Sequence, residues 1–203
     1  LSAYIASKAV VLGAITIVQS VILVALATAR QHGPGRAVIL GWPLGELMVG
    51  VALTGIAAMA LGLLVSAASS TSDRAMTVLP VLLILEMILA AGGLFPDVVD
   101  KPVLKELSYG ASAQWGFAAT AATSDLNDLQ AISNRLRDVR TVNSGDFVPK
   151  LRQALTTRRG GDARFEHTAG AWWSAVLALI ALTIAALIGA GLVLARRDPG
   201  PAP

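Results

Sequence analysis

The sequence contains no cysteine, few aromatic residues and few charged ones, and each shortage excludes a class of protein. Without cysteine the chain forms no disulfide and offers no thiolate to a metal ion. Aromatic residues make up 5% of the chain and the formal net charge is only +3. A nucleic-acid-binding surface needs dense Lys and Arg with aromatic residues between them. We therefore expect no nucleic-acid partner.

Motifs of the common enzyme classes are also missing. No G-x-x-x-x-G-K-[ST] occurs, so the chain has no phosphate-binding loop of its own. No H-E-x-x-H or G-x-S-x-G occurs, and the two histidines, His32 and His167, are far apart in the sequence. We expect no catalytic residue, no metal ligand and no cofactor within this chain.

What the chain does have is four long apolar stretches, in a composition that is 55% hydrophobic and 14% charged. A helix crosses the bilayer core with about 20 residues. The sequence therefore predicts an all-α membrane protein with four transmembrane helices and a large extracytoplasmic loop, 95–170, between the last two. The predicted spans are 9–29, 44–67, 76–94 and 172–195.

Charge next to the spans bears on their orientation. With four spans, both chain ends face one side, where Lys8, Arg74, Arg196 and Arg197 lie against the helix ends. The positive-inside rule then favours cytoplasmic ends. A wider window reverses the count, although a loop longer than about 60 residues is largely exempt from the rule.

Glu86 is the most informative single residue, because it lies near the middle of the third apolar stretch. A charged carboxylate there costs ~2.5–3.5 kcal/mol on insertion scales. Glu86 is therefore either on the path of a transported molecule, or protonated and hydrogen-bonded to Gln19 or Thr54 for structural reasons. Glu46, in the first turn of the second stretch, has the simpler interpretation of an end cap at the interface.

The loop 95–170 divides into two parts. Its first part, 103–123, is fairly apolar and includes Trp115 and Phe117, which indicates either a short helix dipping into the membrane face or a lid on the ends of the spans. In the polar part, 124–166, Phe147, Leu151 and Leu155 recur at helical spacing and predict an amphipathic helix.

Small residues recur every four positions on two of the predicted spans. Ala181, Ala185 and Gly189 do so on the last span, and Ala58 and Gly62 on the second. Such stripes allow helix backbones to approach closely in lipid. They fit a bundle that pairs with itself or with another subunit.

Several short phrases resemble one transporter family. They are Leu1-Ser2-Ala3-Tyr4-Ile5-Ala6-Ser7-Lys8, Ala60-Leu61-Gly62-Leu63-Leu64-Val65-Ser66-Ala67 followed by Ser72-Asp73-Arg74-Ala75-Met76 and Leu79-Pro80, then Gly92-Gly93-Leu94-Phe95-Pro96, and Trp115-Gly116. In this order they resemble the permease domain of type-2, G-subfamily ATP-binding-cassette exporters. The resemblance is closest to actinobacterial half-transporters that carry forkhead-associated and nucleotide-binding domains, and it does not extend to 124–166.

The resemblance implies that residues 1–203 are the carboxy-terminal part of a permease domain, with the third to sixth of six spans, in the cytoplasmic membrane with a cytoplasmic carboxyl end. It implies a lipid or other hydrophobic substrate, a second permease subunit in a homodimer, and an attached nucleotide-binding domain that binds ATP and Mg. Lys8, Asp73 and Arg74 would then lie on the ATPase side. Gln19, Thr54 and Glu86 would be candidates for the substrate path, and Trp115 and Phe117 for an external lid.

Two alternatives come from other classes. A polytopic membrane scaffold or membrane-embedded enzyme without ATP coupling would need a cluster of reactive polar residues at one membrane face, and the sequence offers none. A soluble helical protein would need a polar face on each apolar block, and 79–85 has none.

Overall fold

The structure, a computed structural model, describes residues 2–29, 34, 36–90, 106–126 and 165–197, with side-chain surroundings for 6–29 and 165–196 in the two terminal ranges. Most of these residues are helical, and the described part of the chain contains no strand. The main helices are α1 (Ser2–Thr28), α2 (Pro43–Ala68), α3 (Ser72–Ala90), α6 (Ser112–Thr123) and α9 (Ala169–Arg197). The predicted amphipathic helix around Leu151 lies outside the described residues.

Three of these helices are long and apolar enough to cross a membrane: Ala6–Thr28, Pro43–Ala68 and Ala169–Arg196. They correspond to the first, second and fourth predicted spans. The third predicted span, 76–94, is helical as far as Ala90, but α3 is not among the candidate spans. Its 19 residues include Asp73, Arg74 and Glu86. A count of four spans is therefore not confirmed, and residues 91–94 lie outside the described ones.

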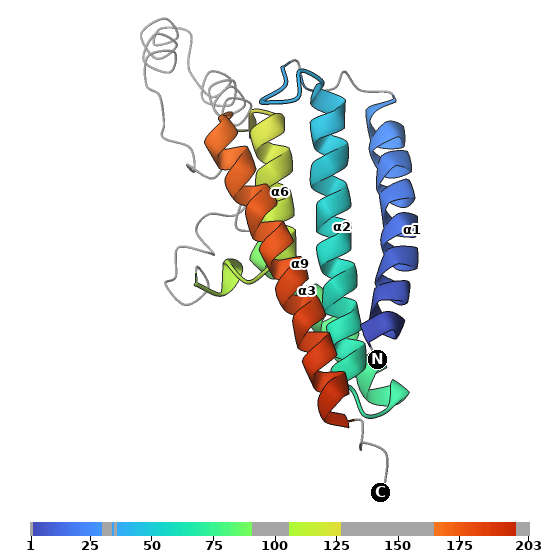
Figure 1. The fold of residues 1–203 in the computed structure, drawn as a ribbon. Helices are drawn as coiled ribbons and strands as arrows, with labels where there is room; N and C mark the ends of the chain where they lie inside the picture. Colours follow the sequence, from blue (N-terminus) through green and yellow to red (C-terminus); the bar gives the residue numbers. More distant parts are fainter. Residues whose placement is uncertain (1, 30–33, 35, 91–105, 127–164, 198–203) are drawn as a thin grey trace, which may run out of the picture.

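The long helices lie side by side and define two ends of a bundle (Figure 1). The start of α1, the α2–α3 turn (residues 69–71) and the end of α9 lie at the lower end in this view. The connection from α1 to α2 and the carboxyl end of α6 lie at the upper end. Both ends of the described chain are therefore at the same end of the bundle.

Local sequence explains where α2 begins and ends. Trp42 is its extended N-cap and Pro43 its first residue, a position where the missing N–H costs nothing. Just before it, Gly41 has a φ of 67°, a left-handed conformation that glycine adopts without strain. At the other end Ser69 is extended and its N–H donates to Val65 O at 2.9 Å, which closes the helix.

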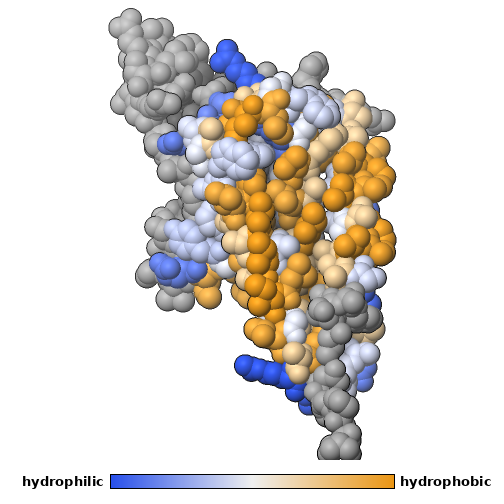
Figure 2. Space-filling view, in the orientation of Figure 1, coloured by the Kyte–Doolittle hydropathy of each residue, from blue (hydrophilic) through white to orange (hydrophobic). Residues whose placement is uncertain are grey.

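The centre of the bundle is built mainly from alanine. The α2 helix contacts α1, α6 and α9, and α6 also contacts α3 and α9. Fully buried positions include Ala57, Ala60, Ala118, Ala122 and Ala175. Lipid tails are as apolar as the side chains of a membrane helix, so burial of apolar surface alone does not drive such helices together. Close packing of the helix backbones, which small residues allow, contributes instead. Large apolar side chains instead cover the outside, and Figure 2 shows them along the middle of the helices with hydrophilic residues near the ends.

The packed stripe on α9 is not the one suggested by the four-residue spacing. Ala181 and Ala185 are exposed, and the buried positions are instead Trp172, Ala175, Val176, Leu179, Ala186 and Ala190. Gly189 is half-buried beside Leu64 of α2. On α2 the buried alanines are likewise Ala57, Ala60 and Ala67, whereas Ala58 is exposed.

Candidate functional site

Glu86 binds the amino-terminal end of α6. Its carboxylate accepts hydrogen bonds from Ser112 N at 3.2 Å, Ser112 Oγ at 3.1 Å and Ala113 N at 2.8 Å. The first N–H groups of a helix lack partners within the helix and carry partial positive charge, so a carboxylate is a favourable cap. Ser112 itself is 2% exposed. Glu86 therefore joins α3 to α6, and neither Gln19 nor Thr54 is its hydrogen-bond partner.

Thr54 lies at the closest approach of α2 and α6. Its hydroxyl donates to Gly50 O of its own helix at 2.7 Å. A Cβ at Gly116 would overlap the Thr54 hydroxyl, and one at Gly50 would lie 3.4 Å from the Ala119 methyl group. The two glycines therefore allow the helices to touch. Thr54 is part of a helix interface in this structure.

Gln19 lies apart from both residues, on the outside of α1. The buried side of α1 carries Gly13, Ser20 and Val24, while Gln19 is exposed among apolar neighbours such as Leu23, which is 60% exposed. The three candidates for the substrate path, Gln19, Thr54 and Glu86, are therefore not brought together within the described residues.

Both lid candidates belong to α6. The Trp115 Nε1–H donates to Tyr109 O at 2.8 Å, and the two rings are 6.0 Å apart. Phe117 packs edge-on against Phe165, just before α9, with ring centres 5.3 Å apart. The helix lies alongside α9 and α2 near the upper end of the bundle, rather than across the ends of the long helices (Figure 1). Of the stretch 103–123, residues 112–123 are thus helical and packed against the longer helices, whereas residues 103–105 lie outside the described ones.

Gln114 is a feature of α6 that the sequence did not single out. Its side chain is 1% exposed, and neither its amide oxygen nor its amide nitrogen has a hydrogen-bond partner in the described part of the chain. The indole N–H of Trp172, which is 3% exposed and packs against Ala122, is unpartnered in the same sense. The sequence signal that could have identified Gln114 is a glutamine within a run of small and apolar residues.

Glu46 has a larger role than an interfacial cap. It is fully buried and accepts hydrogen bonds from the backbone N–H groups of Val38 at 2.9 Å, Ile39, and Leu40 at 2.7 Å. Three successive donors converge on one carboxylate, so Glu46 fixes the segment before α2 against the helix. The sequence predicted Glu46 only as an end cap of its own helix. In the structure it also holds the connection at the upper end of the bundle.

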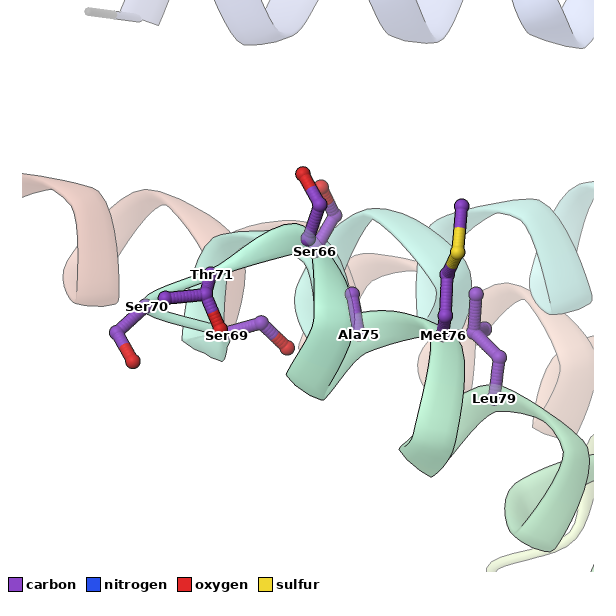
Figure 3. Close-up of a pocket in the computed structure, with 8 residues that line it drawn as sticks. Ser66, Ser69, Ser70, Thr71, Ala75, Met76 and Leu79 are labelled. Carbon is purple, nitrogen blue, oxygen red and sulfur yellow. The ribbon is translucent and has the colours of Figure 1, made fainter.

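A pocket of 420 Å³ opens at the α2–α3 turn (Figure 3). Five hydroxyl-bearing residues and three apolar ones line it: Ser66, Ser69, Ser70, Thr71, Ser72, Ala75, Met76 and Leu79. Arg74, beside the pocket, donates from Nη1 to Ser70 Oγ at 3.0 Å, and its N–H bonds Thr71 Oγ1 at 3.4 Å. Asp73 and Arg74 are exposed here, and Lys8 is exposed near the start of α1 at the same end.

The described residues contain no cluster of three or more His, Asp or Glu side chains suited to a metal ion. Two of their carboxylates, Glu46 and Glu86, instead accept hydrogen bonds from backbone N–H groups. The arrangement defines a polytopic α-helical membrane protein with polar contacts at helix ends and a short helix inserted between longer ones.

Comparison with known proteins adds the family. The chain is 33% identical over 184 residues to the ABC transporter ATP-binding/permease protein Rv1747 of Mycobacterium tuberculosis (strain ATCC 25618 / H37Rv). The match covers 90% of this chain and 18% of that protein. No family model matches the sequence, and no solved structure gives a significant match.

The predicted resemblance to an ATP-binding-cassette transporter permease is confirmed by this relative, and the apolar helices fit the membrane part of such a transporter. The chain spans about a fifth of the relative's length. It is therefore a membrane transport component by similarity, and the activity of the whole relative is not carried over by the match itself.

Proposed function

We propose that this chain is the membrane-spanning part of an ATP-driven exporter that moves a lipid or another hydrophobic molecule across the cytoplasmic membrane. The observation that carries the proposal is the match of 90% of the chain to an ATP-binding/permease protein, together with three helices able to span a bilayer. ATP and Mg would bind to an associated nucleotide-binding domain, since this sequence has no phosphate-binding loop.

The ATPase side is proposed to be the lower end of the bundle in Figure 1. Lys8, Arg74 and Arg196 lie near this end, as expected for a cytoplasmic face under the positive-inside rule. The α2–α3 turn there presents exposed Asp73 and Arg74 beside an open pocket. We propose this turn as a contact for the nucleotide-binding domain.

A second permease subunit is part of the proposal. The exposed faces of α1 and α9 carry Gln19 and the pair Ala181 and Ala185. An exposed amide and small residues are suited to contact with another helix in lipid. These features support pairing with a second copy, which would complete the path for the transported molecule.

The test measures ATP hydrolysis by the nucleotide-binding domain in proteoliposomes with and without this chain. Arg74→Glu at the α2–α3 turn is compared with Arg36→Glu, the same charge change in the connection at the opposite end of the bundle. We expect the chain to change the hydrolysis rate several-fold, Arg74→Glu to abolish that change, and Arg36→Glu to retain it.

A hydrolysis rate that does not respond to the chain would contradict the proposal and favour a polytopic scaffold without ATP coupling. Equal effects of the two charge reversals would leave the ATP-driven assembly standing but would remove the α2–α3 turn from the contact. Movement of a fluorescent phospholipid between leaflets, followed with and without ATP, then tests the lipid substrate.

A further inference from the structure

Gln114 has no hydrogen bond in the position where α6 is packed. A glutamine side chain carries two donors and one acceptor group, and neither its oxygen nor its nitrogen is paired among the described residues although the residue is 1% exposed. A buried polar group without a partner opposes the conformation that buries it. The opposition is larger inside a bilayer, where no bulk water is at hand.

The two ends of α6 are attached differently. At its carboxyl end, Ala122 O lies 2.8 Å from His167 Nδ1 and Ala122 packs on Trp172 at the start of α9. At its amino end, α6 is held by Glu86 of α3. Leu89 is the one buried residue of α3, so this helix is held less firmly in the bundle than α9.

The surface of α6 that faces α2 carries only small residues at the closest contacts. Gly116 and Ala119 meet Thr54 and Gly50, so no large side chain interlocks the two helices there. Gln114 lies on the first turn of α6, close to the end that Glu86 holds. A displacement of this end with α3 would let water reach the Gln114 amide, while the contact of the carboxyl end with α9 remains.

We propose that α6 moves between the described packed position and a second position in which its amino end swings outward with α3, and that buried Gln114 biases α6 toward leaving the packed position. In the proposed exporter, Gln114 is then a positioning residue that favours the displacement of α6 from the space between α2, α3 and α9. The role in transport rests on the proposed function, whereas the movement itself can be measured without transport.

The experiment uses the absence of cysteine from the chain. Ala111, the N-cap of α6, is 2% exposed, so a single cysteine there reacts with a water-soluble methanethiosulfonate only while the amino end of α6 is displaced. The labelling rate in membranes is compared between Ala111→Cys alone and Ala111→Cys with Gln114→Met. Methionine keeps the length and volume of glutamine and removes its polar atoms.

Gln114→Met is expected to slow labelling about tenfold and to raise Tm by about 2–4 °C, because the packed position no longer contains an unpaired amide. Gln114→Leu is expected to change both readouts in the same direction, whereas Ala121→Cys, a 4% exposed position at the attached carboxyl end, should stay protected in every variant. Labelling of Thr168→Cys, an exposed position before α9, should not respond to either substitution.

Unchanged or faster labelling with Gln114→Met, or a lower Tm, would overturn the inference, because it would show that the Gln114 amide does not destabilise the packed position. Slower labelling in a protein that shows no ATP coupling would instead leave the movement of α6 standing and contradict only the transport function.

Discussion

At the scale of single residues, the buried Glu46 and the half-buried Glu86 bind backbone N–H groups rather than each other. Glu86 accepts three hydrogen bonds at the start of α6, and Glu46 accepts three from the segment before α2. Each carboxylate thereby satisfies donors that would otherwise be unpaired in a membrane bundle. Their positions in the sequence, inside apolar stretches, follow from this demand.

Glu86→Ala should lower the free energy of unfolding by about 2–3 kcal/mol, because it leaves a buried helix start without its cap. Glu86→Gln keeps the shape but places an NH₂ group among N–H donors, and a loss of about 1–2 kcal/mol is expected. Ser112→Ala, which removes a single hydrogen bond, should cost ~1 kcal/mol. Denaturant titration of the protein in detergent measures all three.

Glu86→Gln also separates the two interpretations of Glu86. If the carboxylate lies on the substrate path, Glu86→Gln changes export and leaves stability intact. If it acts as the α6 cap, stability falls with the charge. A variant as stable as the parent protein would contradict the capping role.

Glu46→Gln should destabilise the upper end of the bundle by about 2–3 kcal/mol, since hydrogen bonds to a charged acceptor are stronger than neutral ones. Hydrogen exchange at the amides of Val38 and Leu40 is the local measurement. Protection should drop at these two amides and persist at the middle of α2. Uniform loss of protection along α2 would instead mean that Glu46 controls the whole helix.

At the scale of elements, α6 is positioned by complementary small residues. Gly116→Ala should push α6 away from α2, because the new methyl group overlaps Thr54, and overpacking of this kind costs ~1–3 kcal/mol. Thr54→Ala removes the hydroxyl and the methyl group, the two atoms that overlap most, and leaves Cβ at 2.9 Å from the new methyl group. The double variant should therefore recover part of the lost Tm, whereas additive losses would show that the two residues do not touch.

The long helices were predictable and their contacts were not. Hydropathy located the regions of α1, α2 and α9, because a run of about 20 apolar residues matches the thickness of the bilayer core and is rare in other structures. The partner of Glu86 is 26 residues further along the chain, in the part of the loop where the sequence left two arrangements open. Spacing of small residues indicated close packing, yet it selected Ala181 and Ala185 while the bundle buries Ala175 and Ala186.

Gln114 shows why the site could be predicted only in part. A glutamine in an apolar run is visible in the sequence, but whether its amide has a partner depends on how α2, α3 and α9 surround α6. Thr54 was selected for its polarity inside a span, and the structure shows that its importance lies in its contact with Gly116. The sequence thus gives the chemistry of a side chain, whereas the neighbours of that side chain depend on how the helices pack.

At the scale of the whole molecule, the fold has two distinct ends. One end holds the start of α1, the α2–α3 turn and the end of α9, and the other holds the α1–α2 connection and the end of α6 (Figure 1). A transport cycle needs such a separation between an energy-coupling side and a release side. The account depends on the first end facing the cytoplasm.

Single-cysteine labelling in intact cells tests this arrangement most directly, because the chain has no cysteine of its own. Thr71→Cys, in the α2–α3 turn, and Glu166→Cys, before α9, are both exposed positions at opposite ends of the bundle. The account predicts that a membrane-impermeant maleimide labels Glu166→Cys in intact cells and labels Thr71→Cys only after the cells are permeabilised. Labelling of both positions in intact cells, or the reverse order, would contradict it.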